Sequence, residues 1–495
     1  MRRPLLAALV LTSAIAVSCT DDSPRAVDSN NGSSTGTEPG LFGWTDYGDD
    51  DRVQTGHLQV PIDHDDPSKG TFDLFVARHL AEPDKRIGSL LVNPGGPGFG
   101  GSQFAISAGA VYSDTLLQHF DIIGWDPRGT GRSEPAIDCI DDYDHFYASS
   151  DITPETADER AYIAEVAEEF ADACVAAHAD IIDHISTNDT ARDMDAIREA
   201  LGEATISYFG FSYGSELGAT WATLFPDTVR AAVLDGAADP TAGFVEAGIQ
   251  QIKGFEDALS TFLAQCSDDS GCAFHNDGNA ERAFDELMDE LDRRPLASEA
   301  GRPDVNLQVA ITAVSEAMYT DLLWSQLAEA LAAAQNGDGS GLLQLYDMYY
   351  QRTEDGSYSN SLEAFQAIFC MDRPERLTIA EEDATVADMQ AVAPRLAPNT
   401  TGTYFCSFFP PSTDPRATIT GKGAGPILVM GTTGDSATPL SSTRSMASAL
   451  EDGRLVIVTA DQHTGYNVSD CSRGVVDDYL VDPIANAPVD GTECA

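Results

Sequence analysis

Short apolar runs recur along the chain, separated by longer segments with helical periodicity. Helical patterns at 158–177 and 188–201 lie between such runs and are expected to supply crossover connections. Strands that alternate with helices are typical of an α/β fold, so the sequence predicts a mostly parallel eight-stranded sheet. The eight strand-like runs are 58–62, 71–79, 88–93, 120–125, 205–209, 229–235, 426–430 and 454–459.

The segment from 241 to 415 has a different pattern. It contains no convincing strand, and its apolar residues recur at helical spacing, as in Phe255, Leu259 and Phe262. We therefore expect a helical cap, inserted between the sixth and seventh strands. The core of the protein would then consist of two parts, 41–240 and 416–495.

The sequence Gly210-Phe211-Ser212-Tyr213-Gly214 follows the fifth predicted strand and leads into a helical pattern. The turn in such a Gly-x-Ser-x-Gly motif is too sharp for side chains at the two glycines, and it exposes the serine hydroxyl above the sheet. A motif of this kind between a strand and a helix is the nucleophile elbow of α/β-hydrolases. Ser212 is therefore the predicted nucleophile, and the α/β-hydrolase fold is the predicted fold.

A nucleophilic serine needs a histidine to take its proton and a carboxylate to orient that histidine. In this fold the chain order is serine, acid, histidine, and only His275 and His463 follow Ser212. His463 comes just after the last predicted strand and is the predicted base, whereas His275 lies in a polar loop between two cysteines. Asp435 follows the preceding strand and is the predicted acid, although by itself it could equally be a turn or N-cap residue.

The oxyanion of an acyl-transfer reaction needs two backbone N–H donors. Tyr213, the residue after the nucleophile, should supply one of them. The second should come from the glycine-rich loop that follows the third strand, with Gly96 as the predicted donor and Gly95 beside it. A phosphate-binding loop is the competing interpretation, but no Gly-Lys-Ser/Thr follows the glycines.

Several further motifs accompany the elbow. They are Asn93-Pro94-Gly95-Gly96-Pro97-Gly98, Gly124-Trp125-Asp126-Pro127-Arg128-Gly129, Val233-Leu234-Asp235-Gly236 and Gly434-Asp435. With them, the chain resembles the secreted actinobacterial tripeptidyl aminopeptidases and their lipoprotein relatives, which are prolyl-aminopeptidase-related α/β-hydrolases. The resemblance covers about residues 41–495 and implies a serine peptidase. The chain departs from the family at Gln462-His463-Thr464, where the family usually shows Gly-His-Gly.

The chain begins with Met1-Arg2-Arg3, an apolar run from Leu5 to Val17, and then Ser18-Cys19. This pattern is typical of a lipoprotein signal peptide over 1–18, which is too short for a stable transmembrane span. We expect lipid attachment at Cys19, a flexible polar tether over 19–40, and an enzyme anchored on the outer side of the cell membrane. Ordinary secretion is the alternative.

Eight cysteines remain once Cys19 is set aside, and an even number suits an exported protein with disulfides. Zinc binding is the competing interpretation, but the cysteines lack Cys-x-x-Cys spacing, so we expect no metal and no cofactor. Proximity in sequence and the family pattern imply the pairs Cys139–Cys174, Cys266–Cys272, Cys370–Cys406 and Cys471–Cys494.

The chain carries 28 basic residues against 80 acidic ones, a formal net charge of −52. Nucleic acid is excluded as a partner because its phosphates would be repelled. The excess could serve solubility or adaptation to salt, or it could favour substrates with a free amine or a basic side chain. Nothing in the sequence indicates an oligomeric state.

The predicted function is that of an aminopeptidase that releases short peptides or single residues from free N-termini. A carboxylate should bind the substrate amine, and the candidates are Glu216, Glu246 and Glu256, although a glutamate in such a pattern is more often an exposed surface residue. A carboxylesterase that acts on small esters with the same machinery is the alternative. A third possibility is a non-catalytic binding protein, and the intact serine, aspartate and histidine argue against it.

Overall fold

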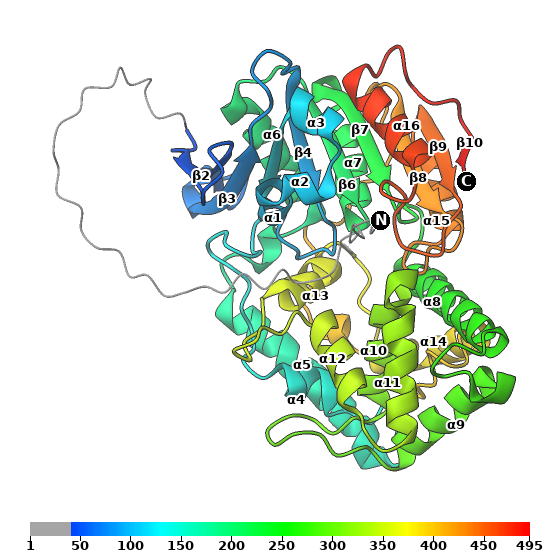
Figure 1. The fold of residues 1–495 in the computed structure, drawn as a ribbon. Coiled ribbons are helices and arrows are strands. Elements are labelled where there is room, and N and C mark those ends of the chain that lie inside the picture. Colours follow the sequence, from blue (N-terminus) through cyan, green and yellow to red (C-terminus); the bar gives the residue numbers. More distant parts are fainter. Residues whose placement is uncertain (1–40) are drawn as a thin grey trace.

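The computed structural model describes residues 41–495. The predicted signal peptide, the tether and Cys19 lie outside the described residues. A sheet forms one half of the described molecule, and a group of helices forms the other half below it (Figure 1). Within 41–495, no helix combines the length and the apolar character that crossing a bilayer requires.

The sheet has ten strands in the order β1-β2-β3-β5-β4-β6-β7-β8-β9-β10. The pairs from β1 to β5 are antiparallel, and all pairs from β5 to β10 are parallel. The strands are β1 (Thr45–Asp46), β2 (Val53–Pro61), β3 (Thr71–His79), β4 (Gly88–Asn93), β5 (Phe120–Trp125), β6 (Ile206–Phe211), β7 (Val229–Asp235), β8 (Ile427–Thr432), β9 (Gly453–Val458) and β10 (Thr492–Cys494).

This architecture confirms the predicted α/β-hydrolase fold with a mostly parallel sheet, but the predicted number of eight strands is too low. The two additional strands, β1 and β10, contain two and three residues and lie at opposite edges of the sheet. Strands this short are too brief to produce an alternating or continuous apolar pattern.

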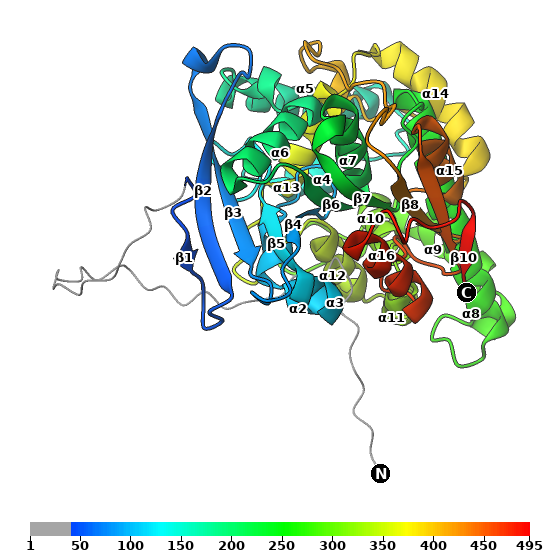
Figure 2. The same cartoon turned by 90° about the horizontal axis from the view of Figure 1, so that it is seen from above.

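Helices cover both faces of the sheet (Figure 2). This arrangement explains the continuous apolar runs of the central strands, because both faces of a parallel sheet are buried. In β6, for example, Tyr208 and Phe209 are both fully buried and belong to two different core clusters. One layer holds α1 (Ser102–Ile106), α2 (Ala108–Val111), α3 (Asp114–His119) and α16 (Asp470–Val481), whose buried residues share one core cluster. The other holds α6 (Thr187–Leu201), α7 (Tyr213–Leu224) and α15 (Leu440–Ala449), whose buried residues belong to the second cluster.

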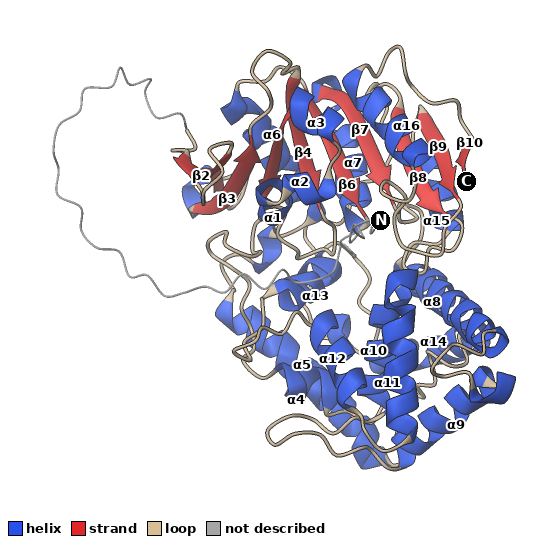
Figure 3. Cartoon of the chain, in the orientation of Figure 1, coloured by secondary structure: helices blue, strands red, loops and turns tan. Residues whose placement is uncertain are grey.

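The helical half lies at the end of the sheet toward which the parallel strands run (Figures 1 and 3). Most of its helices come from the segment between β7 and β8. These are α8 (Phe244–Asp268), α9 (Ala280–Arg293), α10 (Leu307–Met318), α11 (Trp324–Gln335), α12 (Ser340–Tyr349), α13 (Ser361–Met371) and α14 (Ile379–Val392).

Two earlier helices, α4 (Tyr143–Ala148) and α5 (Ala157–Ala177), lie in this half as well (Figure 1). The expectation that the helix at 158–177 would pack on the sheet as a crossover is therefore wrong. The apolar face of α5 packs against aromatic residues of the helical half instead. Phe170 of α5, for example, lies edge-on to Phe405, with ring centroids 5.3 Å apart. Only α6 covers the sheet within this connection.

The structure contains four disulfides, Cys139–Cys174, Cys266–Cys272, Cys370–Cys406 and Cys471–Cys494. Three of them lie in or beside the helical half. The fourth ties α16 to the edge strand β10.

Candidate active site

Ser212 occupies the turn between β6 and α7, with a positive φ of 55°. Its N–H donates to the Asp235 carbonyl oxygen at 2.7 Å, which fixes the turn to the end of β7. A Cβ at Gly210 would lie 2.3 Å from the Gly214 carbonyl oxygen, and one at Gly214 would lie 2.9 Å from the Asn93 carbonyl oxygen. The two glycines of the motif are thus required by close backbone contacts.

His463 and Asp435 are hydrogen bonded to each other. Nδ1 of His463 lies 2.8 Å from Oδ1 and 3.0 Å from Oδ2 of Asp435, whose side chain is fully buried. Asp435 is held in turn by the Thr438 N–H at 2.8 Å and the Thr438 hydroxyl at 3.1 Å. Nε2 of His463 is buried and has no hydrogen-bond partner within residues 41–495. No hydrogen bond joins it to Ser212 in this structure, and no other group of the described chain engages it, so it can accept a proton from a nucleophile.

Burial disfavours the charged form of His463, but the charge and hydrogen bonds of Asp435 more than offset this effect. The pKa of His463 is raised as a result, and Asp235 adds to the shift. Asp235 accepts the N–H groups of Gly465 and Tyr466 at 2.7 and 2.9 Å. It therefore connects the loop that follows His463 to the turn at Ser212.

The glycine-rich loop after β4 lies against the elbow. A Cβ at Gly95 would lie 2.9 Å from the Cβ of Ser212. The Gly95 N–H donates to Oδ1 of Asn93 at 2.9 Å, whereas the N–H groups of Gly96 and Tyr213 find no acceptor in the described part of the chain. The geometry thus favours Gly96 over Gly95 as the partner of Tyr213 in an oxyanion hole.

A cavity of about 130 Å³ joins Ser212 and the two N–H donors to the helical half. The core contributes Gly96, Ser212 and Tyr213 to its lining, and α13 contributes Phe365 and Phe369. The cap therefore forms one wall of the space in which a substrate would meet Ser212.

Three carboxylates line this cavity, and one of them, Glu216, is a candidate that the sequence predicts for binding the substrate amine. Glu216 lies there, but it forms an ion pair with Arg416. Asp239 accepts the Thr241 N–H at 2.9 Å. The third, Asp372, accepts the N–H and the hydroxyl of Thr187 at 2.7 and 2.6 Å.

Burial raises the pKa of Asp372 to about 7, and the nearby charge of Glu216 adds to this. The other two candidate carboxylates lie elsewhere. Glu246 is exposed on α8, and Glu256 is buried where it accepts the N–H of Leu396 at 3.1 Å. Sequence reasoning missed Asp239, Asp372 and the two arginines of the cavity, because they lie between 27 and about 200 residues from Ser212 in the chain.

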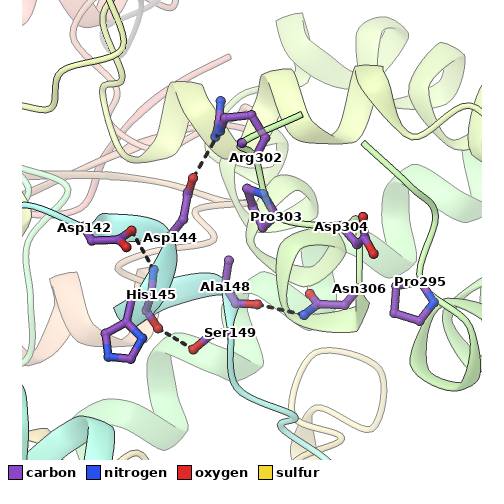
Figure 4. A pocket seen from close by; sticks show the side chains of 11 residues that line it. Asp142, Asp144, His145, Ala148, Ser149, Pro295, Arg302, Pro303, Asp304 and Asn306 are labelled. Carbon is purple, nitrogen blue, oxygen red and sulfur yellow. Dashed lines mark hydrogen bonds and ion pairs between the residues drawn. The ribbon is translucent and has the colours of Figure 1, made fainter. Parts of the chain in front are cut away.

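A second cavity, of about 480 Å³, lies apart from Ser212 in the helical half (Figure 4). Its central cation, Arg302, is ion-paired with Asp144 at 3.1 Å and with Asp347. Its charges are thus engaged with one another, which favours a structural role.

In the described chain, no group of three or more histidine, cysteine, aspartate or glutamate side chains is arranged to hold a metal ion.

The family described as alpha/beta hydrolase fold matches residues 88–467. The chain belongs to the α/β-hydrolase family. It is 34% identical over 457 residues to the serine protease Hip1 of Mycobacterium tuberculosis, covering 89% of this chain and 86% of that protein.

Two further relatives carry different names. Carboxylesterase B of Mycobacterium tuberculosis is 32% identical over 449 residues, covering 88% of this chain and 85% of that protein. Tripeptidyl aminopeptidase of Streptomyces lividans is 30% identical over 447 residues, covering 87% of this chain and 81% of that protein. These relatives confirm the predicted family resemblance, and the α/β-hydrolase protein described here is a serine hydrolase.

Proposed function

We propose that the protein is an exported aminopeptidase that releases short peptides or single residues from free N-termini. The observation that carries the proposal is one cavity that joins Ser212 and two free N–H donors to three carboxylates. Carboxylates are the groups that bind a substrate ammonium. Relatives named serine protease and tripeptidyl aminopeptidase support the same activity.

In the proposed mechanism, Oγ of Ser212 attacks the scissile carbonyl carbon while Nε2 of His463 takes the hydroxyl proton. Asp435 holds the imidazole in the required tautomer and stabilises its charged form. The N–H groups of Gly96 and Tyr213 then stabilise the oxyanion, each by roughly 3 kcal/mol.

When the tetrahedral intermediate collapses, His463 gives its proton to the leaving amine. A water molecule, deprotonated by the same nitrogen, then attacks the acyl-enzyme and releases the N-terminal fragment. The cap wall of the cavity would shield these steps from bulk water on one side. The amine would be bound by one of the cavity carboxylates, with Glu216 as the residue predicted from sequence.

Export belongs to the same proposal. Four disulfides suit an oxidising compartment outside the cytosol. The signal-like segment 1–18 and lipid attachment at Cys19 would place the enzyme on the outer side of the membrane. Metabolic labelling with a fatty acid, compared between the natural chain and Cys19→Ala, would test the anchor.

A carboxylesterase is the second candidate, because a relative with nearly the same coverage is named carboxylesterase B. Ester hydrolysis would use the same serine, histidine and N–H donors, but it would not require a free amine on the substrate.

The deciding experiment compares a tripeptide anilide with a free N-terminus, the same anilide with an acetylated N-terminus, and a short-chain nitrophenyl ester. Ser212→Ala serves as the control. Cleavage of the free anilide alone, abolished in the variant, is the expected result. Turnover of the ester with neither anilide cleaved would contradict the proposal and favour the esterase.

A further inference from the structure

Arg373 follows helix α13 and lines the cavity together with Ser212. Its guanidinium lies 3.7 Å from the centre of the Phe369 ring, and that ring is stacked on Phe365, another lining residue. Nη1 donates to the Phe369 carbonyl oxygen at 3.1 Å. The guanidinium is thus held over an aromatic surface that lines the substrate space.

Most donors of this guanidinium are unused. The guanidinium of an arginine has five N–H donors, and the Phe369 carbonyl is the one hydrogen-bond acceptor that this guanidinium meets within 41–495. Nε is buried and has no partner there. A buried donor without an acceptor costs free energy, so an acceptor supplied by a ligand would be bound favourably.

The two cavity carboxylates whose charges act on Arg373 are not bonded to its guanidinium. Glu216 is paired with Arg416, and Asp372 accepts two hydrogen bonds from Thr187. Burial lowers the pKa of Arg373, and the charge of Glu216 offsets this effect only in part. Within residues 41–495 no carboxylate is ion-paired with or hydrogen bonded to this guanidinium, so its charge has no direct partner there.

We propose that Arg373 is a specificity-determining residue that binds a carboxylate of the substrate. This inference rests on the proposed function and names a further feature of the substrate. A guanidinium presents parallel N–H groups that match the two oxygens of a carboxylate. The carboxylate would be either the C-terminal group of a short peptide or the side chain of an acidic residue.

The test uses two pairs of peptides that have free N-termini. One pair differs only in a C-terminal carboxylate or amide, and the other only in a glutamate or glutamine residue. We expect kcat/KM to favour the carboxylate in one pair by about ten- to a hundredfold, the range for hydrogen bonds between charged groups. Arg373→Met should abolish this preference, and Arg373→Lys should keep part of it. The pair that responds identifies the source of the carboxylate.

Arg352→Met is the matched control. Arg352 also lies over an aromatic ring of the cap, Tyr358 at 5.9 Å, but it is not part of the cavity. This variant should retain the natural preference. Equal kcat/KM values within both pairs for the natural protein would overturn the inference, as would a preference that persists in Arg373→Met.

A third pair separates this inference from the proposed function. It consists of nitrophenyl hydrogen succinate, which has a free carboxylate, and its methyl ester, which has none. Hydrolysis of each is measured by the release of nitrophenol. If no peptide is cleaved, the aminopeptidase proposal fails, while a preference for the free succinate that depends on Arg373 still supports the carboxylate site. If peptides are cleaved without any dependence on Arg373, the carboxylate site fails and the aminopeptidase stands.

Discussion

The hydrogen bond between Asp435 and Nδ1 of His463 predicts that a change of one side-chain oxygen of Asp435 will lower activity. In Asp435→Asn one carboxylate oxygen is replaced by an NH2 group that donates a hydrogen bond to Nδ1, so the imidazole would carry its proton on Nε2, the wrong tautomer for a general base. We expect kcat to fall by roughly 10³- to 10⁴-fold. The measurement is steady-state cleavage of the free tripeptide anilide. Asp461→Asn, an exposed change in the neighbouring loop, should leave kcat within about twofold, since surface substitutions change little.

The raised pKa of His463 sets the pH dependence of the reaction. A general base must be neutral in the free enzyme, so kcat/KM should rise with pH as His463 loses its proton. Because Asp435 raises the pKa above the ordinary value of 6.5, the midpoint of this rise should lie above pH 6.5. A pH profile of kcat/KM checks this, and a midpoint below 6.5 would contradict it.

Among the elements, the contact between the glycine-rich loop and helix α13 positions the cap on the site. A Cβ at Gly98 would lie 2.3 Å from the Ser361 carbonyl oxygen and 2.4 Å from the Phe365 nitrogen, and Gly98 has a φ of +84°. Alanine at this position would both strain the loop and push α13 away from it.

We therefore expect Gly98→Ala to lower the melting temperature and to reduce kcat/KM by at least about tenfold, since small displacements of a catalytic site are costly. Gly109→Ala is the matched control, because Gly109 lies in α2 and a Cβ there meets no atom within 4 Å. If the two variants have equal activity and stability, the loop does not depend on its contact with α13.

For the whole molecule, three buried carboxyl groups predict an unusual dependence of stability on pH. Burial raises the pKa values of Asp235, Glu363 and Asp372 to about 7. Their pKa values in the unfolded chain are near 4, so folding favours the protonated forms. The contribution of these three groups to the free energy of unfolding is complete below pH 4, and it is lost as the pH rises through 7.

The free energy of unfolding should consequently fall between pH 5 and pH 8, with each group contributing up to about 1.4 kcal/mol per pH unit. The large negative charge acts in the same direction, because its self-repulsion increases as carboxyl groups ionise. Thermal denaturation at several pH values is the measurement. Glu363→Gln should make the decrease shallower, whereas the exposed change Glu354→Gln should not. A melting temperature that increases from pH 5 to pH 8 would contradict the prediction.

Local information was sufficient for much of the fold. The central strands are continuous apolar runs because both their faces are buried, and this signal needs no knowledge of partners. The elbow is only partly local: a Cβ at Gly210 would meet the Gly214 carbonyl oxygen, whereas Gly214 is required by its contact with Asn93, which is distant in the chain. Edge strands β1 and β10 escaped prediction because two or three residues carry no periodicity.

The sequence alone determined the fold class, the family and the residues from which a catalytic site could be built, because each depends on contiguous patterns or on steric demands at single glycines. Tertiary structure decided which half of the molecule helix α5 joins. It also decided that Arg416 forms an ion pair with Glu216, while Arg373 keeps N–H donors without acceptors in the cavity. These outcomes depend on side chains brought together from distant parts of the chain. Their pairing is a matter of packing geometry, which no local pattern of apolar and polar residues encodes.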